Sequence, residues 1–161
     1  MSAPDALVVE GLRKTFDVRD ARGRRARLTA VDGVDLRVPA RACVALVGAS
    51  GCGKSTLARC ALRLEAPDDG RIAIDGVSWF VGPGYGDDAA RRRMPRARAL
   101  RRLRRRAQMV FQDSDQAFDP RQRVADILAA PLDLHGLARG TARRPRLEAL
   151  LRDVALDPAA L

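Results

Sequence analysis

Apolar residues in the first third of the chain form short runs of the length that strands have, separated by turn residues. Residues 7–10 and 34–38 predict two short strands, with a basic turn region at residues 19–28 between them. The run at 43–47 is apolar without alternation, which is typical of a strand covered on both faces. The pattern therefore predicts a small β portion that leads into a buried strand.

Farther along the chain, apolar residues recur at helical spacing. Residues 55–64 predict a helix directly after a glycine-rich turn, and residues 124–134 and 146–154 predict two more. Two further strands are predicted at 71–74 and at 108–111. The chain therefore mixes strands and helices along its length, and it shows no internal repeat.

The composition fits one domain with a core of aliphatic side chains, since 47% of the 161 residues are hydrophobic and only 4% are aromatic. No apolar run approaches the roughly 20 residues of a membrane-spanning helix. The N-terminus lacks the basic start and apolar core of a secretory signal. We therefore expect a cytoplasmic protein that reaches a membrane only from its side.

The net charge of +10 comes from one segment, residues 91–106, which holds ten arginines and no acid, so the rest of the chain is neutral. Such a run is most often a solvated helix face, although it could bind a phosphate backbone or anionic lipid headgroups. An insertion loop is expected around 80–95. Lysine occurs only at Lys14 and Lys54, against 28 arginines, so a lysine in a glycine-rich turn is not incidental.

The three cysteines, Cys43, Cys52 and Cys60, include no CxxC pair and have no histidine near them. This pattern indicates neither a disulfide framework nor a zinc site. Cys43 and Cys60 are expected to be small buried residues. Cys52 lies inside the glycine-rich turn, where alkylation is expected to block ligand binding.

Gly48 to Ser55 matches the phosphate-loop pattern G-x-x-x-x-G-K-[ST], after a predicted strand and at the start of a predicted helix. Its backbone N–H groups and the positive end of the helix dipole suit phosphate oxygens. Lys54 is expected to reach the β- and γ-phosphates, Ser55 to ligate Mg²⁺, and Thr56 to support the α-phosphate side. ATP is the expected nucleotide. The predicted phosphate-binding residues are Gly48, Ala49, Ser50, Gly51, Cys52, Gly53, Lys54, Ser55 and Thr56.

A second cluster, residues 108–114 followed by 118–121, narrows the class of phosphate-loop protein. A strand that ends in an exposed glutamine, here Gln112, places a neutral carbonyl oxygen where it can touch Mg²⁺ and an attacking water. The alternative for Gln112 is a solvated amide at the end of a strand.

At these residues the chain resembles the nucleotide-binding subunits of ABC transporters, and most closely the peptide and nickel importer branch. The similar phrases are QMVFQD with a following DPR, where Asp119 replaces the usual asparagine, GASGCGKSTLAR and RVADILAAPL. The resemblance covers residues 7–161. It implies an α/β P-loop NTPase fold, as the N-terminal half of an ABC nucleotide-binding domain with an antiparallel β portion and the start of a helical subdomain.

The resemblance also implies a division of this partial domain over residues 1–161. The β portion and phosphate-loop core would take 7–76, the arginine-rich insertion and helix 77–107, the glutamine loop 108–121, and the start of the helical subdomain 122–161.

Site roles follow from the same resemblance, position by position. Gln112 is similar to the mobile glutamine that contacts Mg²⁺ and passes the nucleotide state to membrane subunits. Phe16 falls where the family places an aromatic that stacks on adenine, the alternative being a core aromatic. Residues 113–134 are similar to the surface that receives a coupling helix from the permease. His135, the only histidine, matches no family motif and is expected on the surface.

Three motifs of the family are absent from the sequence: the LSGGQ signature, the acidic Walker B strand with its catalytic glutamate, and the switch histidine. Hydrolysis needs a group that orients or deprotonates water, so nucleotide binding with negligible hydrolysis is expected. Strands that would neighbour 43–47 are absent too, which predicts an exposed apolar edge and a tendency to aggregate.

The function expected from the resemblance is ATP binding in an importer of peptides or nickel, peripheral on the inner face of the cell membrane. Its partners would be permease subunits, a second ATP-binding subunit and, indirectly, a substrate-binding protein. Two other hypotheses are a nucleic-acid-binding phosphate-loop protein that uses the arginine-rich helix, and a non-functional gene remnant.

Overall fold

The structure is a computed structural model that describes residues 5–86, 100–102, 104–111 and 118–161. Its contacts divide the chain into two compact units, Met1–Gln108 and Met109–Leu161. The first unit holds the sheet and the phosphate loop, and the second is helical.

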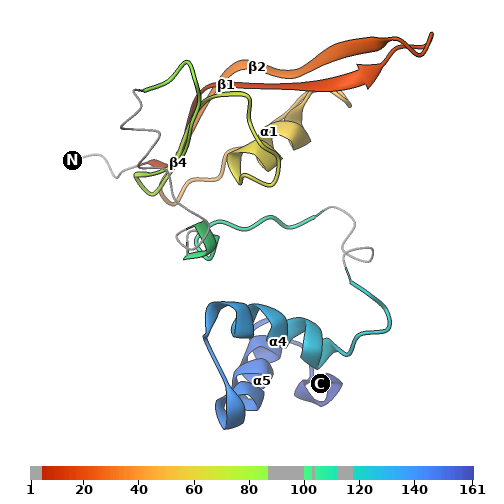
Figure 1. Ribbon diagram of the computed structural model, residues 1–161. Helices are drawn as coiled ribbons and strands as arrows, with labels where there is room; N and C mark the ends of the chain where they lie inside the picture. Colours follow the sequence, from red (N-terminus) through yellow and green to blue (C-terminus); the bar gives the residue numbers. More distant parts are fainter. Residues whose placement is uncertain (1–4, 87–99, 103, 112–117) are drawn as a thin grey trace. The chain divides into compact units, whose positions relative to one another are not determined.

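The first unit is built on a four-stranded antiparallel sheet with the strand order β2-β1-β3-β4. Its strands are β1 (Asp5–Arg19), β2 (Arg25–Pro39), β3 (Asp69–Ile74) and β4 (Val77–Val81), of which β1 and β2 form the long hairpin in Figure 1. The antiparallel β portion is therefore present, with β4 as a strand that the sequence pattern had not revealed.

The prediction of a turn region at residues 19–28 is wrong, because β1 and β2 stay paired as far as Arg19 opposite Arg25. The turn itself is short. The Asp20 carboxylate closes it by accepting hydrogen bonds from the backbone amides of Arg22 and Arg24 at 2.8 and 2.9 Å. One acid therefore folds a turn that is otherwise basic.

Helix α1 (Lys54–Ala61) packs its buried face, Leu57, Cys60 and Ala61, against this sheet. This confirms a helix directly after the glycine-rich turn. The core is completed from the strands by aliphatic side chains and by one fully buried tryptophan. Those strand residues are Val9, Leu12, Val31, Ile72, Ile74 and Trp79.

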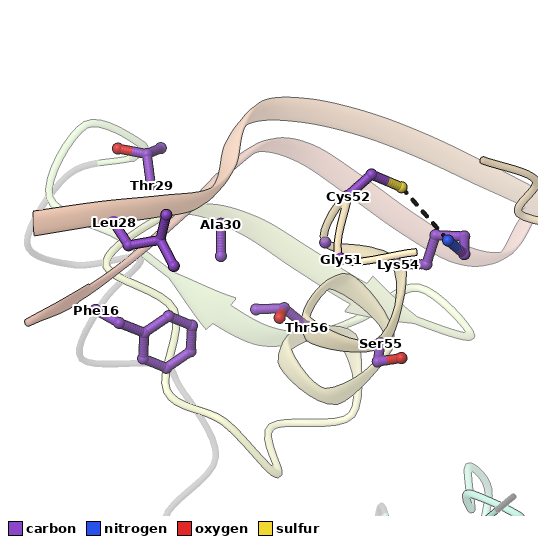
Figure 2. Close-up of a pocket in the computed structure, with 10 residues that line it drawn as sticks. Phe16, Leu28, Thr29, Ala30, Gly51, Cys52, Lys54, Ser55 and Thr56 are labelled. Carbon is purple, nitrogen blue, oxygen red and sulfur yellow. Dashed lines mark hydrogen bonds between the residues drawn. The ribbon is translucent and has the colours of Figure 1, made fainter. Parts of the chain in front are cut away.

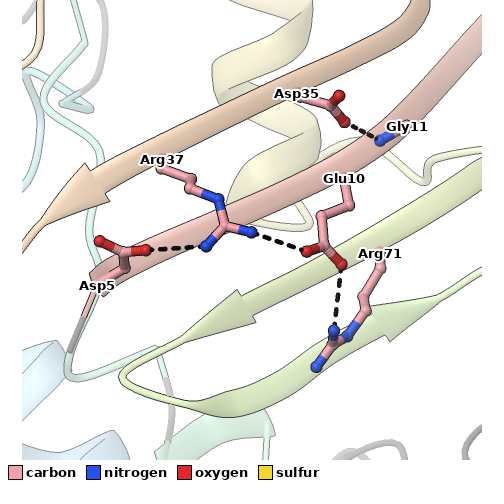
Figure 3. A network of polar contacts seen from close by, with 6 residues as sticks. All are labelled: Asp5, Glu10, Gly11, Asp35, Arg37 and Arg71. Carbon is pink, nitrogen blue, oxygen red and sulfur yellow. Dashed lines mark hydrogen bonds and ion pairs between the residues drawn. The ribbon is translucent and has the colours of Figure 1, made fainter.

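An exposed ladder of ion pairs runs across three strands of the sheet (Figure 3). Arg37 on β2 pairs with Asp5 and Glu10 on β1, each at 3.3 Å, and Glu10 also pairs with Arg71 on β3 at 3.1 Å. Exposed pairs of this kind contribute about 0–1 kcal/mol each. Their main effect is to favour one register of the strands.

Two predicted strands do not form. Residues 43–47 and 108–111 have no strand structure, and Val47 and Val110 are 93% and 94% exposed. A strand is stable only when a neighbour takes up its backbone hydrogen bonds, and the described strands pair only among themselves. The predicted exposed apolar surface is thus present at 43–47, whereas Val110 shows that the buried strand predicted at 108–111 is wrong.

The second unit contains α4 (Val124–His135), the 3₁₀ turn η2 (Gly140–Ala142), α5 (Arg143–Asp153) and η3 (Pro158–Ala160). Both helices predicted here are confirmed. They are held by a small apolar cluster of Leu132, Ala138 and Leu147. His135 is the last residue of α4 and is half-buried. Among the described residues, no helix combines the length and the hydropathy that crossing a bilayer requires.

Candidate nucleotide-binding site

The glycine-rich loop uses two of its glycines for backbone conformations that other residues avoid. Gly51 and Gly53 have φ of 78° and 97°, in the left-handed region that glycine adopts at no steric cost. A β-carbon on Gly53 would also collide with the carbonyl oxygen of Ala30. The loop therefore reaches the helix by a path that requires glycine at this position.

The start of α1 offers backbone amides to a ligand. Its first hydrogen bond runs from Leu57 N to Gly53 O at 2.8 Å. The amides of Lys54, Ser55 and Thr56 come before it and have no carbonyl within the helix to pair with. Gly53 has no side chain that could cap them. This geometry is the general one for binding an anion at a helix N-terminus.

The Lys54 ammonium lies across the loop. Its Nζ donates to the carbonyl oxygens of Gly48 at 2.9 Å and Ala49 at 2.6 Å, and it lies 3.4 Å from Cys52 Sγ. Figure 2 shows the Lys54–Cys52 contact beside the pocket. One positive charge is thus held against the first two carbonyls of the loop.

A cavity of about 330 Å³ joins the loop and the helix start to the β1–β2 hairpin. Figure 2 shows Phe16 on one side of it and the hydroxyl groups of Ser55 and Thr56 on the other. Its lining comprises Phe16, Leu28, Thr29, Ala30, Gly51, Cys52, Gly53, Lys54, Ser55 and Thr56. Seven predicted site residues therefore share one pocket, while Gly48 and Ala49 contribute through the carbonyls that hold Lys54.

Three lining residues, Leu28, Thr29 and Ala30, are missing from the sequence prediction. They lie on β2, and Leu28 pairs with Phe16 across the hairpin. Alternation of Ala26, Leu28 and Ala30 with polar neighbours was the signal that could have revealed them. The arginines in the same stretch obscured it.

The three cysteines differ in their exposure to solvent. Cys60 is buried as predicted, and burial raises the pKa of its thiol to about 11 even though the charge of Lys14 opposes the rise. Cys52 is exposed and lines the pocket. The prediction that Cys43 is buried is wrong, because it belongs to the unpaired segment 43–47 and is exposed.

Of the two residues predicted to hold Mg²⁺, the structure describes only one. Ser55 is exposed at the pocket, but Gln112 lies outside the described residues, as do 91–99 and 103 of the arginine-rich segment. The described residues contain no cluster of three or more histidine, cysteine or acidic side chains that could hold a metal. At the pocket Ser55 offers one hydroxyl to a Mg²⁺ that phosphate oxygens would also hold, as is common beside nucleotides.

The fold and the phosphate loop are those of a P-loop nucleotide-binding protein, and a comparison with known families gives the same class. The family model described as "ABC transporter" matches residues 31–160, and the chain belongs to this family. The fold is similar to that of a solved ATP-binding cassette, MJ0796 in a dimeric post-hydrolysis state bound to ADP and Pi. The TM-score is 0.63 and the sequence identity 23%, over 96% of this chain and 62% of that one. The predicted fold class is confirmed.

The curated relatives that the chain matches are ATP-binding proteins of peptide and nickel import, the branch that the sequence resemblance indicated. It is 36% identical over 133 residues to the di/tripeptide transport ATP-binding protein DppF of Pseudomonas aeruginosa. It is 34% identical over 158 residues to a putative peptide import ATP-binding protein of Brucella ovis, BOV_A0347. It is 35% identical over 133 residues to the nickel import ATP-binding protein NikE of Pseudomonas putida. These matches cover 83%, 98% and 83% of this chain but only 37%, 44% and 44% of the relatives.

Proposed function

We propose that this chain binds Mg-ATP as part of an ABC importer that takes up peptides or nickel. The observation that carries the proposal is that the phosphate loop, the start of α1 and Phe16 line one pocket. A nucleoside triphosphate has an anionic end and an aromatic end, and the pocket offers a partner for each.

At the anionic end, the amides of residues 51–56 hold phosphate oxygens and Lys54 exchanges its loop carbonyls for the β- and γ-phosphates. A bound Mg²⁺ would supply charge neutralisation for the phosphates. Ser55 would hold it, together with Gln112. Thr56 supports the α-phosphate side. At the aromatic end, Phe16 stacks on adenine, with Leu28 beside it as an apolar neighbour.

Binding is proposed to occur with negligible hydrolysis by these 161 residues. In-line attack on the γ-phosphate requires a group that orients or deprotonates water. The family supplies it from the Walker B glutamate and the switch histidine, and closes the site with the LSGGQ signature of a second subunit. This sequence contains none of the three.

The proposed setting is the inner face of the cell membrane, with permease subunits, a second ATP-binding subunit and, indirectly, a substrate-binding protein as partners. The names of the relatives, which concern peptide and nickel import, support the cargo class. An apolar groove of about 550 Å³ in the second unit supports a permease contact, since it includes part of the predicted surface at 113–134. Its lining includes Phe118, Ile127, Leu128, Leu151 and Val154.

The proposal is tested with γ-labelled Mg-ATP and the purified chain. We expect retained label that elutes as intact ATP, and label that is lost in Lys54→Ala. Turnover at about 1 per second or faster, as enzymes commonly show, would contradict binding without hydrolysis. Failure of the folded wild type to retain any label would contradict the proposal as a whole.

A further inference from the structure

Lys14 is the one buried charged residue among those that the structure describes, with 9% relative exposure. It lies on β1, two positions before Phe16, and its ammonium stands 4.8 Å from the centre of the Phe16 ring. Cations are attracted to the face of an aromatic ring at this distance. The ammonium therefore lies over one face of the Phe16 ring. Phe16 lines the nucleotide pocket, whereas Lys14 does not.

Two acids from the segment after α1 hold the Lys14 ammonium. Its Nζ lies 3.0 Å from Glu65 Oε1 and 3.7 Å from Asp68 Oδ1. Burial by itself lowers the pKa of Lys14, but the hydrogen bond to Glu65 and the charge of Asp68 outweigh burial and raise that pKa. Lys14 is therefore charged at neutral pH, as attraction to the ring requires.

The other oxygen of Asp68 holds the strand itself. Asp68 Oδ2 accepts hydrogen bonds from both the amide and the hydroxyl of Thr15, each at 2.6 Å. Asp68 N in turn donates to Arg13 O at 2.9 Å. Three consecutive residues of β1, Arg13 to Thr15, are thus bound to Asp68.

This attachment occurs where β1 loses its second neighbour in the sheet. Pairing of β1 with β3 ends at Arg13 opposite Asp69, whereas pairing with β2 continues to Arg19. Phe16 therefore lies on a stretch that is paired with β2 but not with β3. The register of β1 with β2 is irregular on both sides of Lys14. Contacts of Lys14 and Thr15 with Glu65 and Asp68 hold this stretch where β3 no longer pairs with it.

We propose that Lys14, held by Glu65 and Asp68, is a positioning residue for the base of the bound nucleotide. It sets the orientation of Phe16 and so acts on affinity for the base and not on affinity for the phosphates. This inference rests on the proposed nucleotide binding. It gives the two lysines of the chain separate tasks, Lys54 at the phosphates and Lys14 behind the aromatic ring.

The test compares two ligands, Mg-ATP and inorganic Mg-triphosphate, which lacks the base, by calorimetry on the full chain. Lys14→Met is expected to bind ATP about tenfold more weakly, because stacking of a base on an aromatic contributes about this much. Its affinity for triphosphate stays within about twofold of wild type. Arg13→Met is the matched control, since it removes one positive charge from the neighbouring position, where the side chain is exposed and paired with Asp32 at 2.8 Å.

A double variant separates positioning from general damage. Phe16→Ala is expected to lose ATP affinity, and adding Lys14→Met to Phe16→Ala is expected to lose no more. Glu65→Gln, which keeps the shape of the side chain, must give the same ATP-selective loss as Lys14→Met and covers the case that Lys14→Met does not fold.

The outcomes separate the positioning role of Lys14 from the proposed nucleotide binding. Equal weakening of both ligands by Lys14→Met and Glu65→Gln, or a further loss in the Phe16→Ala background, overturns the positioning role and leaves the proposed function standing. Absence of triphosphate binding in the folded wild type, or its persistence in Lys54→Ala, overturns the proposed function itself.

Discussion

Gly53 at the end of the phosphate loop lies directly against the carbonyl oxygen of Ala30 on β2. Both residues line the same pocket, so this contact joins its phosphate side to its hairpin side. The loop and the hairpin consequently cannot move apart or together without changing the shape of the pocket.

Gly53→Ala is therefore expected to destabilise the fold by about 2 to 4 kcal/mol, because it adds a steric collision to a strained left-handed backbone. Gly23→Ala is the control. Gly23 has φ of 75° at the hairpin tip, and a β-carbon there meets nothing within 4 Å, so only the backbone cost of about 1 to 2 kcal/mol applies. Denaturant unfolding of the two variants measures the difference. Equal losses of stability would show that the contact with Ala30 is not tight.

The cysteines provide a second prediction, with a control inside the chain. Cys43 and Cys52 are exposed and Cys60 is buried. Because the pKa of Cys60 is raised from 9.0 to about 11, its reactive thiolate is about two orders of magnitude scarcer at neutral pH than that of an ordinary thiol. Iodoacetamide is therefore expected to label Cys43 and Cys52 well before Cys60.

Mg-ATP is expected to protect Cys52 from iodoacetamide but not Cys43, since only Cys52 lines the pocket. Alkylated Cys52 is in turn expected to prevent nucleotide binding. Peptide mass spectrometry after timed labelling follows each site. Protection of both cysteines to the same degree, or of neither, would argue against a ligand seated on this loop.

Whether a structural feature could be predicted from the sequence depends on how close together in the chain its residues lie. The phosphate loop and α1 were predictable because glycines, lysine and helical spacing act within a few residues of one another. The strand predicted at 43–47 does not form, because a strand depends on neighbours that pair with it. Val47 is 93% exposed, and the described strands pair only among themselves.

The contacts around Phe16 could not be predicted from the sequence for the same reason, because they join residues that lie far apart in the chain. Thr15 and Asp68 are 53 positions apart, and nothing in the local pattern shows that the loop after α1 returns to β1. The pocket residues Leu28 to Ala30 were not predicted, because neighbouring arginines obscure the apolar alternation that shows β2 to continue through them. Gln112 and the predicted domain boundaries stay predictions.

The cluster of Lys14 and Asp68 predicts how stability depends on pH. Partial burial of Asp68 acts to raise the pKa of its carboxyl, but hydrogen bonds from Thr15 and the charge of Lys14 outweigh this and lower the pKa below its ordinary 3.8. A carboxyl whose pKa is lowered on folding stabilises the protein above its unfolded pKa, and this contribution is lost as pH falls through the folded value. Wild type is thus expected to lose more free energy of unfolding than Asp68→Asn as pH falls from about 5 toward 3.

At alkaline pH, Lys14 contributes a pH dependence of stability with the opposite sign to that of Asp68. The pKa of Lys14 is raised above its ordinary 10.5, so its stabilising contribution is complete below that pH and is lost as pH rises through the folded pKa. Lys14→Met is expected to flatten the decline of stability above about pH 10.5. Urea unfolding over the pH range measures both effects. Parallel pH profiles for wild type and both variants would show that the ion pairs contribute nothing to folding.

Calorimetric titration of Mg-ATP into the purified chain and into Lys54→Ala tests the central claim most directly. Arg59→Ala is the control, because Arg59 also carries one positive charge on α1 but lies in its last turn and is exposed. We predict saturable binding by wild type and Arg59→Ala, and a loss of about 10- to 100-fold in Lys54→Ala, as expected for a charged hydrogen-bonding group. No binding by folded wild type, or equal affinity in all three proteins, would contradict the account.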